Sequence, residues 1–189
     1  MPEFETERLV VRRLRPHDLD DFAALCGDPV ILRYMDEGRP LSGAETATWL
    51  DVTLANYRER GWGCFGVTAK PEDRLIGFCG FSRPPDRPGV VELIYALAPS
   101  QWGRGYATEV TRAMVAFGFE RCGLTRIEAT VDPANEASKR VLEKIGMSYV
   151  GRGEDDDGSS TDYYLVGRPD GSPRMARQRE QGRSDEGTI

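Results

Sequence analysis

The chain has 189 residues, of which 39% are hydrophobic and 30% charged, and its formal net charge at pH 7 is -6. This size and balance predict one soluble domain with a single core, because two full domains would need a longer chain. Residues 1–15 contain no apolar run of signal-peptide length, and no window reaches the roughly 18 apolar residues that a membrane span needs. We therefore expect a cytoplasmic protein with no membrane partner, and the acidic charge argues against broad nucleic-acid binding.

The cysteines and the single histidine form no metal-binding or disulfide pattern. Cys26, Cys64, Cys79 and Cys122 lie far apart with no CxxC pair, and His17 is the one histidine in the sequence. Zinc sites and disulfide frameworks both need closer or more regular spacing. The sequence predicts reduced, mostly buried thiols and no metal cofactor.

The first half of the chain is predicted to hold one strand, then helices, then a meander of strands. Residues 8–14, RLVVRRL, alternate polar and apolar side chains as a strand does. Ser42 and Glu45 fit a capping box, in which a hydroxyl and a carboxylate satisfy free amides at a helix start. The predicted helices cover residues 16–26, 30–35 and 42–60, the last ended by Gly61. The predicted strands of the meander cover residues 62–69, 74–82 and 90–97.

The second half is predicted to form a helix, a strand, a second helix and a closing hairpin. Their ranges are 103–122, 126–131, 134–145, and then 147–152 with 162–166. Residues 167–189 offer almost nothing to bury, so we expect a disordered tail after a domain of residues 1–166. The order predicts a single α/β (α+β) domain, with a mixed, mostly antiparallel sheet of six to seven strands flanked by about four helices.

The stretch WGRGYAT, from Trp102 to Thr108, lies between a predicted strand and a predicted helix. Glycines there let the backbone approach a ligand without a Cβ in the way, and the unpaired amides of a first helical turn point toward negative charge. The stretch therefore predicts a phosphate-binding loop. A plain tight turn between strand and helix is the alternative that a glycine pair alone leaves open.

Two common phosphate loops do not fit this stretch. A P-loop needs GxxxxGK[ST], and no lysine follows Gly103 or Gly105 at that spacing. The dinucleotide fingerprint needs GxGxxG or GxGxxA, and Thr108 stands in its last position. A meander also precedes the loop in place of repeated βαβ units, so the context excludes a dinucleotide domain.

A third arrangement fits better. The strand VVELIYAL, the loop WGRGYA, a helix, a strand and the segment DPANEASKRVLEKIGM follow one another in this chain. In this order, over about residues 6–166, the chain resembles the GNAT superfamily of N-acetyltransferases, in its ribosomal-protein N-terminal acetyltransferase (RimJ/RimL-like) branch. The opening ETERLVVRRLRPHDLDDFAAL is typical of that branch. The resemblance implies a GNAT-like fold, acetyl-CoA as acetyl donor, direct transfer to an amine and no metal, and it leaves a homodimer open.

The resemblance also implies which residues bind the coenzyme. The superfamily loop reads Gln/Arg-x-x-Gly-x-Gly/Ala, and Gly105 and Ala107 match its last two motif positions, whereas Trp102 departs from the first. The pyrophosphate grip is mostly through main-chain amides, so the departure removes one side-chain contact and leaves the loop. Asn135 matches an asparagine that contacts the pantetheine arm, with a helix N-cap as the alternative. The implied coenzyme-binding residues are Leu97, Gly103, Arg104, Gly105, Tyr106, Ala107, Thr108 and Asn135.

Two residues are candidates for catalysis. Ser138 falls where this branch carries a serine near the coenzyme sulfur, and the tyrosine acid of many other branches would fall on Leu142. Ser138 is the candidate to protonate or hydrogen-bond the departing thiolate, although a thiol of pKa ~8.5 leaves readily at neutral pH. Glu92 alternates onto one strand face with apolar residues, where burial disfavours the charged form and suits a general base acting directly or through water. A solvent-facing rim glutamate is the alternative, and the resemblance also implies a bulge in this strand.

The implied reaction starts with an uncharged primary amine that attacks the acetyl thioester, while backbone amides hold the oxyanion. At pH 7, loss of a proton costs about 1 kcal/mol for an α-amino group and about 4 to 5 kcal/mol for a lysine. This difference favours a protein or peptide N-terminus as acceptor. A small amine (an antibiotic, polyamine or amino acid) and a CoA-binding module without catalysis are the alternatives. The turn at residues 153–158 carries four carboxylates, which would attract a cationic acceptor or simply form a solvated hairpin tip.

Overall fold

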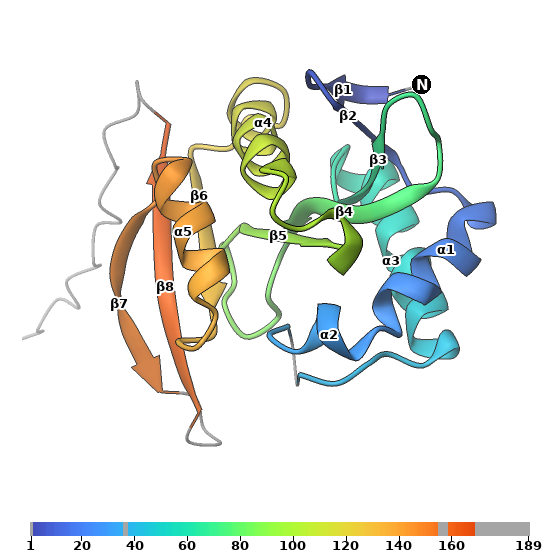
Figure 1. The fold of residues 1–189 in the computed structure, drawn as a ribbon. Helices are drawn as coiled ribbons and strands as arrows, with labels where there is room; N and C mark the ends of the chain where they lie inside the picture. Colours follow the sequence, from blue (N-terminus) through green and yellow to red (C-terminus); the bar gives the residue numbers. More distant parts are fainter. Residues whose placement is uncertain (1, 36–37, 155–158, 169–189) are drawn as a thin grey trace, which may run out of the picture.

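A mixed sheet of eight strands runs through the computed structural model, which describes residues 2–35, 38–154 and 159–168 (Figure 1). The strand order is β1-β2-β3-β4-β5-β6-β8-β7, and only the central pair β5 and β6 is parallel. The strands are β1 (Pro2–Glu5), β2 (Leu9–Arg13), β3 (Cys64–Ala69), β4 (Leu75–Ser82), β5 (Glu92–Leu97), β6 (Arg126–Val131), β7 (Ser148–Glu154) and β8 (Ser160–Gly167). Most of the expected tail and of the acidic turn, residues 169–189 and 155–158, lies outside the described residues.

Five α-helices and two short 3₁₀ turns accompany the sheet in the described part of the chain. They are η1 (Pro16–Asp18), α1 (Leu19–Cys26), α2 (Pro29–Leu32), α3 (Gly43–Arg60), η2 (Pro99–Gln101), α4 (Tyr106–Glu120) and α5 (Glu136–Lys144). Figure 1 shows α1, α2 and α3 grouped together, apart from α4 and α5. The sheet therefore has helices against both faces, as an α/β layer architecture requires.

Alternation along the central strands divides the core into two apolar clusters. Phe78 and Ile94 pack with residues of α1, α2 and α3, whereas Cys79 and Leu93 pack with residues of α4. Successive side chains of a strand point to opposite faces of the sheet, so two neighbouring residues of β4 or β5 contribute to different clusters. Burial on both faces explains why β3 and β4 read as nearly continuous apolar runs.

The predicted helix boundaries follow from their caps. Ser42 Oγ accepts a hydrogen bond from the Glu45 amide at 3.3 Å, and Glu45 Oε2 accepts one from the Ser42 amide at 2.8 Å, so the capping box is confirmed. Gly61 ends α3 with a φ of 79°, a left-handed conformation that glycine adopts without a Cβ clash. The short helix α2 is displaced from the predicted 30–35 and starts at Pro29, after an Asp28 N-cap.

The fold class is as predicted, but the strand count is wrong by at least one. The additional strand is β1, which pairs antiparallel with β2 at the edge of the sheet. Its sequence, PEFE, carries a proline and two glutamates, and such residues mark an edge strand that periodicity does not reveal. The last strand, β8, ends at Gly167, one residue after the predicted domain boundary.

A buried ionic cluster joins β2 to the start of the first helices. The Arg12 side chain, in a residue only 4% exposed, donates hydrogen bonds to both carboxylate oxygens of Asp18 at 2.8 and 2.9 Å and to Asp73 Oδ1 at 2.8 Å. Burial alone would raise the pKa of Asp18, but hydrogen bonds from Arg12 and from the Arg15 amide outweigh it and hold the pKa below its usual value.

The cysteines are free in the structure, as expected. Cys26, Cys64 and Cys79 are buried and Cys122 is half-buried. Burial raises the pKa of Cys26 to about 12 and that of Cys122 to about 11, so both are inert thiols at neutral pH. No helix within the described ranges is both long and apolar enough to cross a bilayer.

Candidate active site

The central strands β5 and β6 lie side by side only at one end. Their pairing joins a single pair of residues, Glu92 and Glu128, through a backbone hydrogen bond of 2.9 Å from the Glu128 amide to the Val91 carbonyl. By contrast, β4 pairs with β5 over six residues, from Ser82 with Glu92 to Gly77 with Leu97. Within the described part of the chain, the backbone edge of β5 that faces β6 therefore has no strand partner beyond Glu92.

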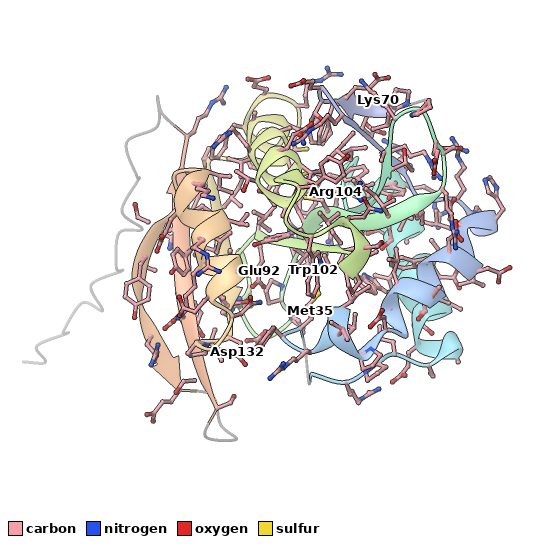
Figure 2. The ribbon with its side chains drawn as sticks, viewed as in Figure 1. Met35, Lys70, Glu92, Trp102, Arg104 and Asp132 are labelled. Atoms are coloured by element: carbon pink, nitrogen blue, oxygen red, sulfur yellow. The ribbon has the colours of Figure 1, made fainter. Side chains whose placement is uncertain are left out.

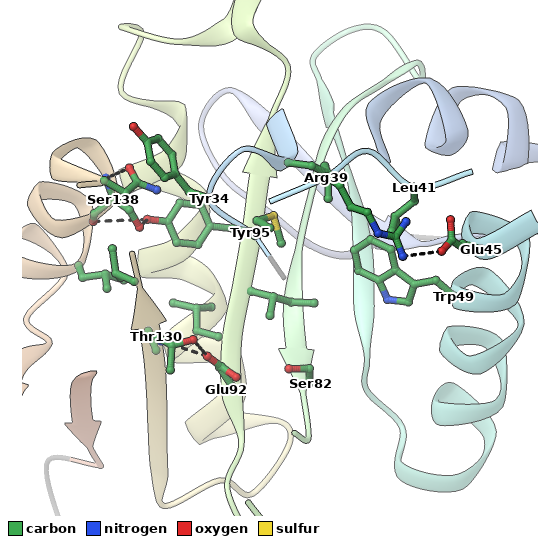
Figure 3. A pocket seen from close by; sticks show the side chains of 18 of the residues that line it. Tyr34, Arg39, Leu41, Glu45, Trp49, Ser82, Glu92, Tyr95, Thr130 and Ser138 are labelled. Carbon is green, nitrogen blue, oxygen red and sulfur yellow. Dashed lines mark hydrogen bonds and ion pairs between the residues drawn. The ribbon is translucent and has the colours of Figure 1, made fainter. Parts of the chain in front are cut away.

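A cavity of about 710 Å³ lies at this parting of the strands (Figure 3). Its walls come from β5, β6, the start of α5, the segment after α2 and the first half of α3. Aromatic and aliphatic side chains from the α2 to α3 region, including Tyr34, Leu41 and Trp49, form one side of it. The cavity therefore combines apolar walls with polar groups, which include the ion pair of Arg39 with Glu45 on the α3 side and further polar side chains where the strands part.

Glu92 is one of those polar groups. Its side chain is 12% exposed, and its carboxylate accepts hydrogen bonds from the Thr130 amide at 3.0 Å and from the Thr130 hydroxyl. Arg87 donates to the second carboxylate oxygen at 3.1 Å. The apolar face predicted for Glu92 exists farther along β5, where Ile94 and Ala96 pack into a core cluster, but the carboxylate itself has polar partners. The Thr130 bonds could not be predicted from the sequence because Thr130 lies on another strand, 38 residues away.

Ser138 and Asn135 lie at the start of α5, on the other side of the parting. Asn135 is the N-cap of α5, and its Oδ1 accepts a hydrogen bond from the Ser138 amide at 3.1 Å. The Ser138 hydroxyl lies 2.7 Å from the hydroxyl of Tyr95 on β5. Leu142, at the position of the tyrosine acid in other branches, is fully buried in the core. Asn135 and Ser138 line the cavity, together with Tyr95, which was not predicted as a site residue.

An ion cluster fixes α5 to the last strand. Asp162 lies on β8, and its side chain is 3% exposed. Its carboxylate forms ion pairs with Lys139 Nζ at 2.9 Å and with Arg152 Nε at 2.7 Å. Lys139 also donates to the Pro133 carbonyl at 2.6 Å. Hydrogen bonds from Arg152 and Lys139, opposed by burial, lower the pKa of Asp162 to about 2. The cluster therefore holds the start of α5, and with it Ser138, against the sheet.

This lowered pKa predicts an acid-dependent loss of stability. Because the folded pKa of Asp162 is about 2 and its ordinary value is 3.8, the stabilisation is complete above the ordinary value and is lost as the pH falls through the folded one. The free energy of unfolding should therefore drop more steeply between pH 4 and pH 2 in the parent than in Asp162→Asn, by denaturant titration. Glu154→Gln, which changes an exposed carboxylate on β7, should follow the parent curve. Parallel curves for the parent and Asp162→Asn would contradict the assignment.

The glycine loop follows β5 after the short turn η2. Gly103 and Gly105 have φ values of 74° and 80°, which few residues other than glycine adopt at low cost. Gly105 is the N-cap of α4, and the Glu109 amide donates to its carbonyl at 3.0 Å, so the amides of Tyr106, Ala107 and Thr108 form the first helical turn. Such amides have no partner within the helix and favour an anion.

Trp102, the residue that departs from the motif, lies on the surface of this loop. Its indole is in a residue 52% exposed, and the indole nitrogen donates to the Leu97 carbonyl at 2.7 Å. The bond closes the turn between the end of β5 and the loop. Figure 2 shows Trp102 and Arg104 on the segment that joins β5 to α4, whereas Glu92 belongs to β5 itself. Leu97 is only 5% exposed, and its carbonyl is the acceptor of the Trp102 bond.

A clamp from the N-terminal segment holds this loop. Arg8 Nη1 donates to the Arg104 carbonyl at 3.0 Å, and its guanidinium lies 4.6 Å from the centre of the Tyr106 ring. Glu109 in α4 accepts bonds from Arg8 Nε at 2.7 Å, from the Arg8 amide at 3.0 Å and from the Thr6 hydroxyl at 2.6 Å. Burial alone would raise the pKa of Glu109, but the hydrogen bonds from Thr6 and Arg8 outweigh it, so the pKa is lowered. Sequence analysis gave no sign of this contact, which spans 101 residues.

The candidate residues thus lie on β5, on the segment that follows it, and at the start of α5 opposite β5. Glu92 begins β5, Leu97 ends it, the loop from Gly103 to Thr108 follows, and Asn135 and Ser138 lie across the parting. The bulge implied in β5 is absent from its pairing with β4, which runs without a register shift. Among residues 2–35, 38–154 and 159–168, no group of three His, Cys, Asp or Glu side chains is placed to hold a metal ion.

Comparison with known proteins identifies the class that this fold and site define. Residues 8–148 match the family model of the acetyltransferase (GNAT) domain. The match covers most of the chain, so the chain belongs to the GNAT acetyltransferase family. It is accordingly an N-acetyltransferase, and acetyl-CoA is its acetyl donor.

Individual relatives cover nearly the same length. The uncharacterized N-acetyltransferase p20 of Bacillus licheniformis is 30% identical over 156 residues, which make up 80% of this chain and 85% of that protein. An acetyltransferase from Agrobacterium tumefaciens str. C58 superposes with a TM-score of 0.76 and 27% identity, covering 89% of this chain and 95% of the other.

Two further structures share the fold alone. One is RimL, a ribosomal L7/L12 α-N-protein acetyltransferase in complex with coenzyme A, at a TM-score of 0.74, 16% identity and coverages of 88% and 98%. The other is the aminoglycoside acetyltransferase AAC(6')-Ib in complex with coenzyme A. Its TM-score is 0.69 and its identity 20%, and the match covers 85% of this chain and 95% of the other. The same fold therefore serves protein and small-molecule acceptors.

Proposed function

We propose that the protein transfers the acetyl group of acetyl-CoA to a primary amine in the cavity where β5 and β6 part, and that the acceptor is the α-amine of a protein or peptide, as in the RimJ/RimL-like branch. The observation that carries the proposal is the arrangement on β5. A carboxylate stands at the start of the strand, an unpaired backbone edge follows, and a loop suited to an anion comes at its end. These parts suit an amine, a thioester arm and a pyrophosphate in that order.

The loop would hold the coenzyme's phosphates mainly through its backbone. The amides from Gly103 to Thr108 supply donors at the positive end of α4, and Arg104 supplies a charge. The unpaired edge of β5 up to Leu97 can bond an extended arm as a neighbouring strand would. Asn135 caps α5 with its oxygen, which leaves its amide nitrogen for the arm.

Glu92 and Ser138 would act on the reacting atoms. Glu92, oriented by Thr130 and Arg87, accepts the amine's proton directly or through a water molecule. Ser138 donates a hydrogen bond to the sulfur, on which negative charge develops as the bond from carbon to sulfur breaks. Coenzyme A leaves as a weakly basic thiolate, so no strong acid is required.

The choice of acceptor rests on proton chemistry and on the cavity. An α-amine is uncharged at neutral pH far more often than a lysine amine, so it needs less help from Glu92. A small amine is the second candidate, because a cavity of about 710 Å³ has the size of an ordinary small-molecule pocket. Its apolar walls at Leu41 and Trp49 favour an acceptor with an apolar body in either case.

Release of free thiol from acetyl-CoA, measured with a panel of acceptors, tests the proposal. The panel pairs short peptides with free N-termini against the same peptides blocked at the N-terminus, each containing a lysine, and adds polyamines, aminoglycosides and free amino acids. Turnover with free but not blocked peptides is the expected result. Turnover confined to the small amines would transfer the proposal to the second candidate, and no turnover with any amine would refute both.

The clamp on the loop predicts a loss of coenzyme affinity on mutation. Arg8→Ala removes the bond to the Arg104 carbonyl and leaves Glu109 without its cation beside the phosphate-binding amides. We expect the Kd for acetyl-CoA, measured by calorimetry, to rise about fivefold to twentyfold, the range of a charge-assisted hydrogen bond. Arg58→Ala removes an equal charge from the exposed face of α3 and should leave the Kd unchanged. Equal Kd values for the two variants would show that the clamp does not support the loop.

A further inference from the structure

Tyr95 reaches across the parting of the strands. It belongs to β5, yet its hydroxyl lies 2.7 Å from the hydroxyl of Ser138 on α5, and Figure 3 shows the two side chains pointing toward each other. The ring packs against the main apolar cluster, and both residues line the cavity. The motif position on α5 holds Leu142 in place of a tyrosine.

The direction of this hydrogen bond decides what Ser138 can do. A serine hydroxyl can donate one hydrogen bond and accept others, so its free hydrogen is fixed only by its neighbours. Tyr95 is half-buried, and the nearest acceptor to its phenol hydrogen among the described residues is Ser138 Oγ, since the Ser138 carbonyl is farther away at 3.5 Å. When Tyr95 donates to Ser138 Oγ, the hydrogen of Ser138 is left for a group in the cavity.

The surroundings keep the Tyr95 phenol protonated, so it has a hydrogen to donate. Burial raises the pKa of Tyr95 well above its usual value, although the hydrogen bond with Ser138 opposes the rise, so the phenol remains protonated throughout the neutral range. The Thr130 hydroxyl, on the other wall, is already bonded to Glu92. Ser138 is thus the cavity hydroxyl that lies within hydrogen-bond distance of a protonated phenol.

We propose that Tyr95 is a positioning residue, which holds the Ser138 hydroxyl as a hydrogen-bond donor to the coenzyme sulfur. This inference rests on the acetyl transfer proposed above. As the amine nitrogen bonds to the acetyl carbon, the bond from carbon to sulfur breaks and its electron pair stays on sulfur, where Ser138 stabilises it. The proton lost by the amine passes to Glu92 or water. Tyr95 keeps its own proton, and the net products are the amide, the thiolate and one proton.

Tyr95→Phe tests the proposal because it removes one oxygen and keeps the packed ring. With acetyl-CoA and the best acceptor of the panel, kcat should fall about fivefold to tenfold while the KM for acetyl-CoA stays within about twofold, as for the loss of one hydrogen bond made in the transition state. Ser138→Ala should show a similar loss, and the double variant should be no slower than Ser138→Ala. Tyr149→Phe, on an exposed β7 tyrosine, is the matched control and should retain the parental kcat.

A second measurement does not depend on turnover. The thiol pKa of coenzyme A bound to each variant can be followed by the ultraviolet absorption of the thiolate. A donor aimed at the sulfur lowers this pKa, so it should be lower in the parent and in Tyr149→Phe than in Tyr95→Phe and Ser138→Ala. Melting temperatures of the variants show whether each remains folded.

The outcomes separate this inference from the proposed function. A parental kcat and a parental thiol pKa in Tyr95→Phe would overturn it, and so would losses that multiply in the double variant, because Tyr95 would then act independently of Ser138. If the parent acetylates none of the amines, the acceptor proposal fails. The thiol pKa still decides whether Tyr95 orients Ser138.

Discussion

Replacing Glu92 by glutamine is expected to lower kcat by about a hundredfold or more, while the Kd for acetyl-CoA stays within about twofold of the parent. The amide keeps the size of the side chain but cannot accept a proton, and general-base catalysis contributes about 10² to 10⁴ in rate. Glu92 is distant from the glycine loop along β5, so coenzyme binding has no reason to change. Thiol release at saturating acceptor and calorimetry with acetyl-CoA measure the two quantities.

Glu128→Gln provides the matched control for this change. Glu128 faces Glu92 across the paired end of β5 and β6 and bonds the same Arg87, at 3.2 Å, but it does not line the cavity. Its replacement should cost much less activity than that of Glu92. Equal losses in the two variants would assign the effect to the Arg87 cluster, and an unchanged kcat in Glu92→Gln would remove Glu92 from the chemistry.

The largest expected effect on stability is at Arg12. Arg12→Met keeps much of the side-chain volume and leaves the Asp18 carboxylate buried without its cation, so the free energy of unfolding should fall by about 3 to 5 kcal/mol. Burial decides the size of this effect, since both side chains are no more than 6% exposed. Urea or guanidinium titration with a two-state fit measures it.

Arg13→Met, one residue along β2, is the comparison for Arg12. The Arg13 side chain is 46% exposed and pairs with Glu3 at 2.6 Å on the surface. Exposed pairs of this kind contribute about 0 to 1 kcal/mol, so this variant should be nearly as stable as the parent. Similar destabilisation by both variants would show that burial of the Arg12 cluster does not set its energetic weight.

Local sequence signals predicted the elements whose causes are local. The Ser42 and Glu45 capping box, the Gly61 helix end and the strand-to-helix glycine loop all depend on residues within a few positions of one another. The edge strand β1 escaped prediction because its short, charged, proline-containing sequence shows no strand periodicity, and its partners Arg13, Lys70 and Phe117 lie elsewhere in the chain. The family resemblance, in turn, depended on several such signals in the right order.

The contacts that define the site could not be predicted in the same way. Tyr95 bonds Ser138 across 43 residues, and Thr130 bonds Glu92 across 38. Hydrophobic periodicity states which face of an element is buried, but it carries no information about which polar side chains meet between elements. Sequence analysis therefore named Glu92 and Ser138 without their partners.

The clamp by Arg8 couples two distant parts of the molecule. The loop that would cradle the coenzyme's phosphates is held by a side chain located 96 residues upstream, beside the outermost strands of the sheet. Anything that steadies the loop must then also steady the attachment of the N-terminal segment, because linkage between two sites is reciprocal. Binding of acetyl-CoA and docking of the N-terminal segment should therefore stabilise each other, and a tag or truncation at that end should change the affinity of the loop for the coenzyme.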